Sequence, residues 1–600
     1  MDHKTSKFRA PKGRFGRTLL SLVITAVIGF GYFYVTLPAL NLQNKDFYSF
    51  LGLLCIVYVI CVFLLSGAPR DNVVRTPGEK IKEWFGFVKR RCLPVGILFV
   101  ALIVVALVGQ VLSLPIFRAA DYRDLLTVQE GDFASDVAQI SFNEIPTLDR
   151  QSAEYLGDRQ MGTLSDMVSQ FEYSNDSTQI NYQGRPVRVA PIAYADLIKW
   201  LTNRGEGLPA YVVVDMVTQE ATVVRLQEGM KYSFSEPLNR NIMRHLRFQY
   251  PAMMFATPQF EIDENGHPWW IAPRVVKTIG LFGGTDIQGA VLMDAITGES
   301  EYCEEVPTWV DTLYVPELIM EQYDYHGTLV NGFINSIFGQ RGVTMTTDGY
   351  NYIAMNDDVY VYTGVTSANA DQSNLGFLLC NMRTKETHYY EAPGATEYAA
   401  QQSAMGVVQD LGYVATFPLL LNIAGEPTYF IPLKDATELV KTYAMVNVAQ
   451  YQIVATGSTV SACENSYIQM LADKGITTEE QLPQNQVSGI LAEIRTAVLD
   501  GNTYYFLRLE GGDVFYSISA AQNREVVTLN AGDTVTIDHA VPPEGSAASI
   551  LDGYTLTIDR RAAPRVQTDP LSISGLQESY DALETPPVSS GSGLPLSPSA

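Results

Sequence analysis

The sequence predicts an α+β protein with three N-terminal transmembrane helices, a large extracytoplasmic region of tandem small α+β modules and a small all-β barrel. Three observations carry this prediction. Residues 1–115 contain three long apolar runs, a hairpin motif recurs through residues 173–460, and short strands separated by Gly-containing turns fill residues 486–561. Because 600 residues are more than one hydrophobic core usually organises, several domains are expected.

The apolar runs cover residues 18–38, 47–67 and 93–115, and none of them contains a charged residue. Each can cross the hydrocarbon core of a bilayer as a helix, which takes about 20 residues. A secretory signal peptide is the alternative interpretation of the first run, but a small-residue cleavage site is lacking and a second apolar run follows after a short loop. We therefore expect a membrane domain over residues 1–115, with the lipid bilayer as its partner.

Basic residues around these runs predict the orientation of the chain. Six Lys and Arg residues precede the first run and seven lie between the second and third, whereas only Lys45 lies between the first and second. Because basic residues beside membrane segments stay in the cytoplasm, we expect the N-terminus inside and residues 116–600 outside a plasma membrane. That outer region is strongly acidic, with 60 of the 65 acidic and 27 of the 41 basic residues.

The outer region has only three cysteines, Cys303, Cys380 and Cys463. So few cysteines do not make a disulfide scaffold, and their odd number leaves at least one of them unpaired within the chain. The outer region is therefore expected to fold by burial, and its sparing use of cysteine favours a bacterial cell envelope. The redox state of the three cysteines stays open.

A hairpin motif marks the tandem modules. The stretches 177-STQINYQGRPVRVAPIA-193 and 259-QFEIDENGHPWWIAPRV-275 share Ile, three residues, Gly, one residue, Pro, three residues and Ala-Pro. The outline returns at 421–433 and, with Asn351 in place of Pro, at 345–355. Each Gly is expected in the turn between two strands, where the backbone favours Gly, Asn or Asp, and the regular spacing predicts about four modules over residues 173–460. The four turn glycines are Gly184, Gly266, Gly349 and Gly425.

A second motif follows the hairpin in three modules. An apolar strand ends in Asp215, Asp294 or Asn381, and Thr and Glu come three and five residues later. We expect the Asp294 carboxylate to accept N–H groups of the following turn rather than to act in catalysis, because short polar side chains commonly satisfy turns. In the fourth module 445–457 is only a candidate. The stretch 194–204 predicts a short helix with Leu197, Trp200 and Leu201 on one face.

This strand and Thr-Gly-Glu turn beside a short helix resembles the PepSY-type module of propeptides and extracytoplasmic regions of bacterial membrane proteins. The resemblance covers about residues 173–460 and departs from the pattern in the third and fourth modules. The whole chain is similar to three-span membrane proteins of Gram-positive bacteria that have a long outer region. The resemblance implies a small α+β fold and a role in protein interaction or in peptidase inhibition.

The segments around the modules are expected to play connecting roles, with one exception. Residues 116–172 are predicted to form a juxtamembrane connector. Its helical stretch near 150–173 is expected to pack on the first module, and a stalk or self-association surface is the alternative. Residues 461–485 read as a second connector. Residues 486–561 predict a small β-barrel of OB or SH3 type, and its acidic residues argue against nucleic acid as a partner. The Pro- and Ser-rich residues 562–600 are expected to be disordered.

The sequence contains no recognisable catalytic, cofactor or metal motif, so we predict no catalytic, cofactor-binding or metal-binding residue. Cys303 has no arranged base, the turn 263-DENG-266 lacks the distal Glu of a calcium loop, and 457-GSTVSA-462 is a Ser/Thr-rich turn. None of the six histidines has the close spacing of metal ligands. They are His3, His245, His267, His326, His388 and His539.

Trp269 and Trp270 are neighbours in a predicted strand, so their side chains point to opposite faces. One is expected in the core. The other would permit a stacking surface for a sugar or peptide, although packing within an aromatic-rich sheet is favoured.

Three functional interpretations remain. The first is a non-enzymatic, membrane-anchored interaction or scaffold protein of the bacterial cell envelope with an extracytoplasmic protein partner. The second, which rests on the PepSY resemblance, is a regulator or inhibitor of a cell-surface peptidase, the peptidase being the partner. The third is an enzyme that acts on cell-wall polymer.

Overall fold

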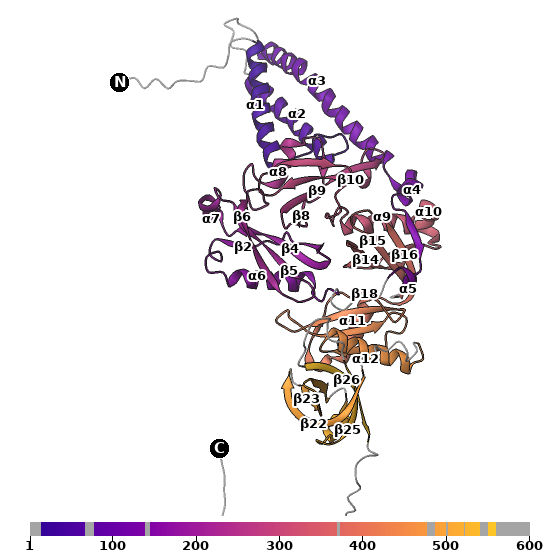
Figure 1. The fold of residues 1–600 in the computed structure, drawn as a ribbon. Helices are drawn as coiled ribbons and strands as arrows, with labels where there is room; N and C mark the ends of the chain where they lie inside the picture. Colours follow the sequence, from indigo (N-terminus) through magenta and orange to yellow (C-terminus); the bar gives the residue numbers. More distant parts are fainter. Residues whose placement is uncertain are drawn as a thin grey trace, which may run out of the picture. The chain divides into compact units, whose positions relative to one another are not determined.

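The computed structural model describes residues 14–66, 77–137, 145–368, 373–476, 486–499, 502–520, 523–539 and 550–559. Its described part is mixed α+β, as predicted (Figure 1). The chain divides into two compact units, Met1–Pro483 and Gln484–Ala600. The predicted disordered tail, residues 562–600, lies outside the described residues.

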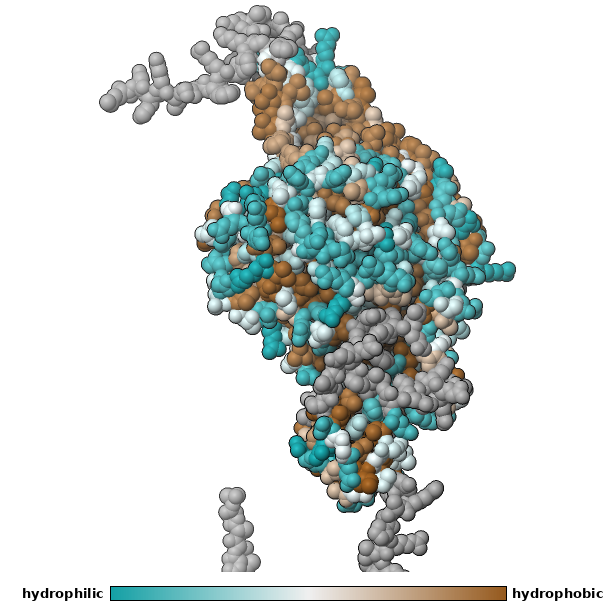
Figure 2. Space-filling model, in the orientation of Figure 1, coloured by the Kyte–Doolittle hydropathy of each residue, from teal (hydrophilic) through white to brown (hydrophobic). Residues whose placement is uncertain are grey.

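Three apolar helices begin the chain, α1 (Arg14–Thr36), α2 (Lys45–Ser66) and α3 (Pro77–Leu112). Each contains a stretch that is long and apolar enough to cross a membrane, so the predicted number of candidate spans is confirmed. These stretches are Gly16–Thr36, Lys45–Leu65 and Val88–Leu112. Figure 2 shows the apolar surface of the helices beside the mostly hydrophilic surface of the following part of the same unit.

The α2 helix contacts both α1 and α3. Gly29 permits the close approach of α1 and α2, because a Cβ atom there would lie 2.5 Å from Cδ2 of Leu54. Small residues commonly allow such contacts between membrane helices.

Four antiparallel sheets with the same connectivity follow the apolar helices. In each sheet a long strand pairs along one edge with the two short strands that precede it in the chain, and along its other edge with the next strand, which pairs with the one after it. The first sheet has β2 (Phe171–Tyr173), β3 (Thr178–Tyr182), β4 (Arg185–Tyr194), β5 (Leu208–Asp215) and β6 (Ala221–Met230). The second has β7 (Met254–Phe255), β8 (Gln259–Ile262), β9 (Pro268–Ile279), β10 (Gly283–Asp294) and β11 (Ser300–Cys303).

The third sheet has β12 (Thr344–Thr346), β13 (Asn351–Met355), β14 (Asp358–Ser367), β15 (Ser373–Asn381) and β16 (Thr387–Ala395). The fourth has β17 (Val414–Ala415), β18 (Leu419–Ile423), β19 (Glu426–Lys434), β20 (Val440–Asn447) and β21 (Val454–Gly457). A helix precedes each sheet in the chain, and we call the helix and its sheet a module. The four helices are α6 (Arg150–Gly162), α8 (Ile242–Gln249), α9 (Pro316–Thr328) and α11 (Glu397–Val407).

The helical stretch near 150–173 belongs to the first module, because α6 contacts β2, β5 and β6 of its sheet. The predicted helix at 194–204 is α7 (Leu197–Asn203), and its predicted apolar face is wrong in part. Trp200 is buried and its indole N–H donates to Glu236 at 2.7 Å, whereas Leu197 and Leu201 are exposed. A helix of two turns brings only one of its large side chains to the core.

The hairpin turns use residues with positive φ, as predicted, but the third turn is not at Gly349. Gln183–Gly184 joins β3 to β4 and Ala424–Gly425 joins β18 to β19, while Gly266 closes the longer turn between β8 and β9. In the third module Asn356–Asp357 takes this position, with φ of 52° and 65°. Asn and Asp tolerate the left-handed region, so the turn needs no glycine. Gly349 lies between β12 and β13, where a Cβ atom would lie 2.5 Å from the Phe417 ring.

The turn after the fourth strand of each module is held by a polar side chain at the end of that strand, which is the predicted residue in the first three modules. Oδ1 of Asp294 accepts the N–H groups of Ile296 and Thr297 at 2.7 and 3.0 Å, so its expected structural role is confirmed. Oδ1 of Asp215 and of Asn381 accept equivalent pairs of N–H groups. Asn447 occupies this position in the fourth module and accepts the N–H of Gln450 at 2.8 Å.

The two predicted connectors are part of the module structure. Residues 116–172 hold α4 (Pro115–Arg123), β1 (Val128–Gly131) and α5 (Phe133–Asp136) before α6. The β1 strand pairs in parallel with β16, so the chain that leaves the apolar helices first joins the third sheet. The segment 461–485 begins within α12 (Val460–Asp473). This helix contributes Cys463, Tyr467 and Leu471 to the buried cluster that contains side chains of the third and fourth sheets. Residues 477–485 lie outside the described residues.

Hydrophobic packing joins the modules in pairs. One buried cluster contains side chains of the first and second modules, among them Val189 and Trp270. Another contains side chains of the third and fourth modules, together with α5 and α12.

The second module is fastened to both α1 and α3. Nε of Arg244 and of Arg247 donate to the carbonyls of Tyr34 and Leu37 at 3.2 and 2.9 Å, at the end of α1 where carbonyls lack helical partners. After α3, the Ser113 hydroxyl oxygen accepts the N–H groups of Leu281 and Phe282, both at 3.0 Å. These bonds fix the second module at the end of the candidate spans.

The second unit consists of five strands and one 3-10 helix (Arg524–Thr528) in its described part. Its strands are β22 (Gln486–Leu499), β23 (Asn502–Leu509), β24 (Phe515–Ser519), β25 (Thr534–His539) and β26 (Ile550–Asp559). They close in the order β22, β23, β24, β26, β25, and β24 pairs with β26 in parallel.

The Asp294 turn gives a prediction with an internal control. Asp294→Ala leaves two N–H groups without an acceptor, so we expect it to lower the free energy of unfolding of the second module by about 1 to 2 kcal/mol. Asp294→Asn should change it little, because Asn381 performs the same task in the third module. Urea unfolding monitored by tryptophan fluorescence measures both; equal losses would contradict this account.

A buried acid on α12 predicts a pH dependence. One oxygen of the Glu464 carboxyl is buried without a partner among the described residues, and burial raises the pKa of Glu464 from 4.5 to about 8. An acid with a raised pKa in the folded state makes stability fall as pH rises, here between about 4.5 and 8, by about 1.4 kcal/mol per pH unit at most. Glu464→Gln should make the thermal midpoint fall less between pH 5 and 8. Asp473→Asn, an exposed change on the same helix, should leave this pH dependence unchanged.

Candidate binding cavity between the modules

The hairpins of the four modules meet and enclose a cavity of about 400 Å³. The β3 strand of the first module contacts β8 of the second and both β13 and β14 of the third, and β13 contacts β18 of the fourth. The recurring hairpin therefore supplies some of the contacts between the pairs of modules. Every module contributes residues to the lining, including Arg188, Gln259, Tyr352 and Phe417.

Two buried nitrogen donors on one face of the first module line this cavity. Arg188 on β4 pairs directly with Gln179 on β3, so their side chains lie side by side on the same face of the sheet. They are 4% and 5% exposed. Nε of Arg188 and Nε2 of Gln179 have no hydrogen-bond acceptor among the described residues.

The remaining bonds of Arg188 go to neutral atoms. Its Nη1 donates to the carbonyl and the hydroxyl oxygen of Ser177 at 3.3 and 3.2 Å. Burial lowers the pKa of Arg188 from its ordinary value, whereas a paired carboxylate would raise it. In the described part of the chain Arg188 forms no ion pair with a carboxylate. A guanidinium stays protonated in proteins, so the cavity contains a buried positive charge.

The acid nearest to this network is already bonded elsewhere. Oε1 of Glu154 on α6 accepts the Ser177 hydroxyl at 3.0 Å and Nε of Arg150 at 2.7 Å. Asp149, which caps α6, is bonded to Lys434 of the fourth module at 2.9 Å. Burial alone would raise the pKa of Asp149, but hydrogen bonds from Ser152 and Lys434 hold it below its ordinary value. Glu154 and Asp149 are thus paired with Arg150 and Lys434 rather than with Arg188.

The opposite wall comes from the second and third modules. The Tyr350 hydroxyl donates to Oε1 of Glu317 at 2.9 Å, and the rings of Tyr350 and Tyr352 meet edge to face at 5.6 Å. Burial is the main cause that raises the pKa of Tyr352, so it stays protonated near neutral pH. The side chain of Asn351 holds this wall to the fourth module by donating to the carbonyl of Phe417 at 3.2 Å.

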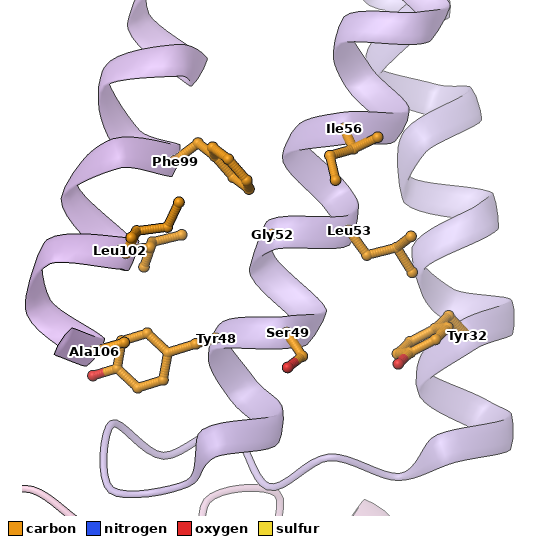
Figure 3. Close-up of a pocket in the computed structure, with 10 residues that line it drawn as sticks. Tyr32, Tyr48, Ser49, Gly52, Leu53, Ile56, Phe99, Leu102 and Ala106 are labelled. Carbon is orange, nitrogen blue, oxygen red and sulfur yellow. The ribbon is translucent and has the colours of Figure 1, made fainter. Parts of the chain in front are cut away.

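A second hollow, of about 490 Å³, lies among the apolar helices (Figure 3). Tyr32 of α1, Tyr48 and Gly52 of α2, and Phe99 of α3 face it, and most of its other lining residues are apolar. It lies within the candidate spans, and in a bilayer lipid chains would surround these helices. The cavity between the modules, which contains polar groups and a charge, is therefore the better candidate for specific binding.

The residues considered in the sequence do not gather into a site. The Asp263 carboxylate accepts the N–H groups of Asn265 and His267, which makes 263–266 a turn. Cys303 is half-buried, and burial raises the pKa of its thiol. Thr459 caps α12, so 457–462 serves a helix start. In the described residues no three His, Cys, Asp or Glu side chains are placed to hold a metal ion.

The described histidines do not share a site, and three of them contact different partners. His267 contacts the Asp294 carboxylate at 3.2 Å, His326 the carbonyl of Arg123, and His388 the Glu386 carboxylate. Trp270 is fully buried, as expected for one of the two tryptophans, and its indole donates to the carbonyl of Tyr232. Trp269 packs against Trp309 with ring centroids 5.8 Å apart, so a neighbouring ring covers it in part.

Comparison with known proteins adds no family. No family model matches the chain, and no curated protein matches it. One solved structure that resembles it weakly is described as the crystal structure of a B. megaterium levansucrase mutant. It is 8% identical, the match covers 73% of this chain and 98% of that one, and the TM-score is 0.18, a value too low to support an argument about fold or function.

Proposed function

We propose that this chain is a non-enzymatic, membrane-anchored interaction protein of a bacterial cell envelope, with residues 116–600 on the extracytoplasmic side. The three apolar helices and the distribution of basic residues around them support the anchoring and the orientation. The observation that carries the binding role is the cavity between the modules, because residues of all four modules line it and Arg188 on its wall has no carboxylate partner among the described residues.

The chemistry of the lining favours binding over catalysis. The cavity has no histidine or cysteine among its described lining residues. The hydroxyl group of Ser177, a lining residue, donates to a Glu154 carboxylate which also accepts Arg150. An activated nucleophile needs a base that is oriented and free to take its proton. The arrangement instead offers hydrogen-bond donors and aromatic rings to a ligand.

A regulator or inhibitor of a cell-surface peptidase is the second candidate. It rests on the PepSY resemblance and on the polar turn that the four modules share at Asp215, Asp294, Asn381 and Asn447. In that case the purified full chain should change the rate at which a peptidase from the same envelope cleaves its substrate. Unchanged rates across a panel of such peptidases would remove this candidate.

Site-specific photocrosslinking on intact cells tests the proposed function. Gln151 is exposed at the rim of the cavity, whereas Glu228 is exposed on β6, the far edge strand of the same sheet. With a photoreactive amino acid at 151 we expect one defined envelope partner, and with the same amino acid at 228 a much lower yield of it. Equal yields at both positions, or crosslinks to cytoplasmic proteins only, would contradict the proposal.

A further inference from the structure

We infer that the cavity between the modules binds a small ligand through a carboxylate group, with Arg188 as the anchoring cation. This inference rests on the proposed function and names the chemistry of its ligand. It starts from a cost in the unliganded protein: a buried charge without an acid partner is unfavourable, and buried nitrogen donors are almost always satisfied. Arg188 combines both unfavourable features at the wall of a cavity large enough for a ligand.

The free donors match a carboxylate. A guanidinium presents its N–H groups in a planar fork that fits the two oxygens of a carboxylate. Because Nη1 of Arg188 is engaged by Ser177, Nε remains for an incoming oxygen. The amide nitrogen of Gln179 is directly across the strand pair and also lacks an acceptor. One anionic group placed between them would satisfy both side chains.

The acids around the cavity favour a singly charged group over a phosphate dianion. Arg150 and Lys434 compensate Glu154 and Asp149, which leaves Glu317 as a negative charge on the wall, and the outer region has 60 acidic against 27 basic residues. A second negative charge on the ligand group would be repelled by this carboxylate and by the acidic surroundings. The tyrosine wall of Tyr350 and Tyr352 adds aromatic surface and hydroxyl groups for the rest of the ligand.

Calorimetric titration of the full chain in lipid nanodiscs tests this inference. The probes are tri-alanine with a free C-terminal carboxylate, tri-alanine with a C-terminal amide, acetate and inorganic phosphate. We expect the free acid to bind at least ten-fold more tightly than the amide, and acetate to bind more tightly than phosphate, because a charge-assisted bond to the guanidinium is available only to an anion.

Two variants locate the binding. Arg188→Gln should weaken the free acid at least ten-fold, whereas Arg185→Gln, a change at an exposed arginine on the same strand, should not. Gln179→Glu places a carboxylate opposite Arg188, so it should abolish binding while raising the thermal midpoint of the unliganded protein. This second variant keeps the test valid if Arg188→Gln folds poorly.

Four results would overturn the inference: equal binding of acid and amide, tighter binding of phosphate than of acetate, unchanged binding by Arg188→Gln, or no binding of any probe to the wild-type protein. Such results would leave the proposed function intact if crosslinking at Gln151 still captured its partner. Loss of that crosslink with carboxylate binding preserved would instead contradict the proposed function alone.

Discussion

The packing of four equivalent hairpins against one another is the constraint on which the outer region depends. Hydrophobic cores join the first module to the second and the third to the fourth. Between these pairs, β3 of the first module contacts β13 and β14 of the third, and Leu318 of α9 lies in a buried cluster with side chains of the second sheet. Short strands with polar residues cannot fill the space completely, and the cavity is what remains between them.

The order of segments along the chain differs from their order in the structure, and this difference ties the modules together. After α3 the chain places β1 on the edge of the third sheet before it forms the first module. Lys434 of the fourth module bonds to Asp149 at the start of α6 in the first. The second module holds the ends of α1 and α3 through Arg244, Arg247 and main-chain N–H groups. Movement of one module would therefore displace residues in the others.

Features that depend on composition or on local turns were predictable from the sequence. The three apolar helices follow from long uncharged runs, and the Asp294 turn follows from a side chain that bonds to its own neighbours. Gly349 was assigned wrongly because an Asn-Asp turn adopts the same backbone conformation as a Gly turn, so the spacing of glycines alone misplaces the third hairpin. The predicted apolar face of α7 is wrong in part, because periodicity over two helical turns does not show which side chains reach a core.

The cavity was not predictable, because its residues come from segments as distant as Arg188 and Phe417 and meet only in the folded chain. One local signal was present. In 185-RPVRVAPIA-193 a single arginine interrupts a strand that is otherwise apolar after its first residue. A charge within a continuous apolar run, which predicts burial of both faces, indicates either an ion pair or a ligand, and the structure shows no such ion pair among the described residues.

Crosslinking between the hairpin tips of the first and third modules tests the central claim most directly. The side chains of Asn181 and Asp357 lie 3.5 Å apart, although no common hydrophobic core joins their modules. With cysteine at both positions, a short bismaleimide should join them in high yield, as mass spectrometry of the linked peptides would show. With cysteine at 228 and 357 it should not. Failure of the first pair to react, or equal reaction of both pairs, would mean that the hairpins do not converge and that the cavity does not exist.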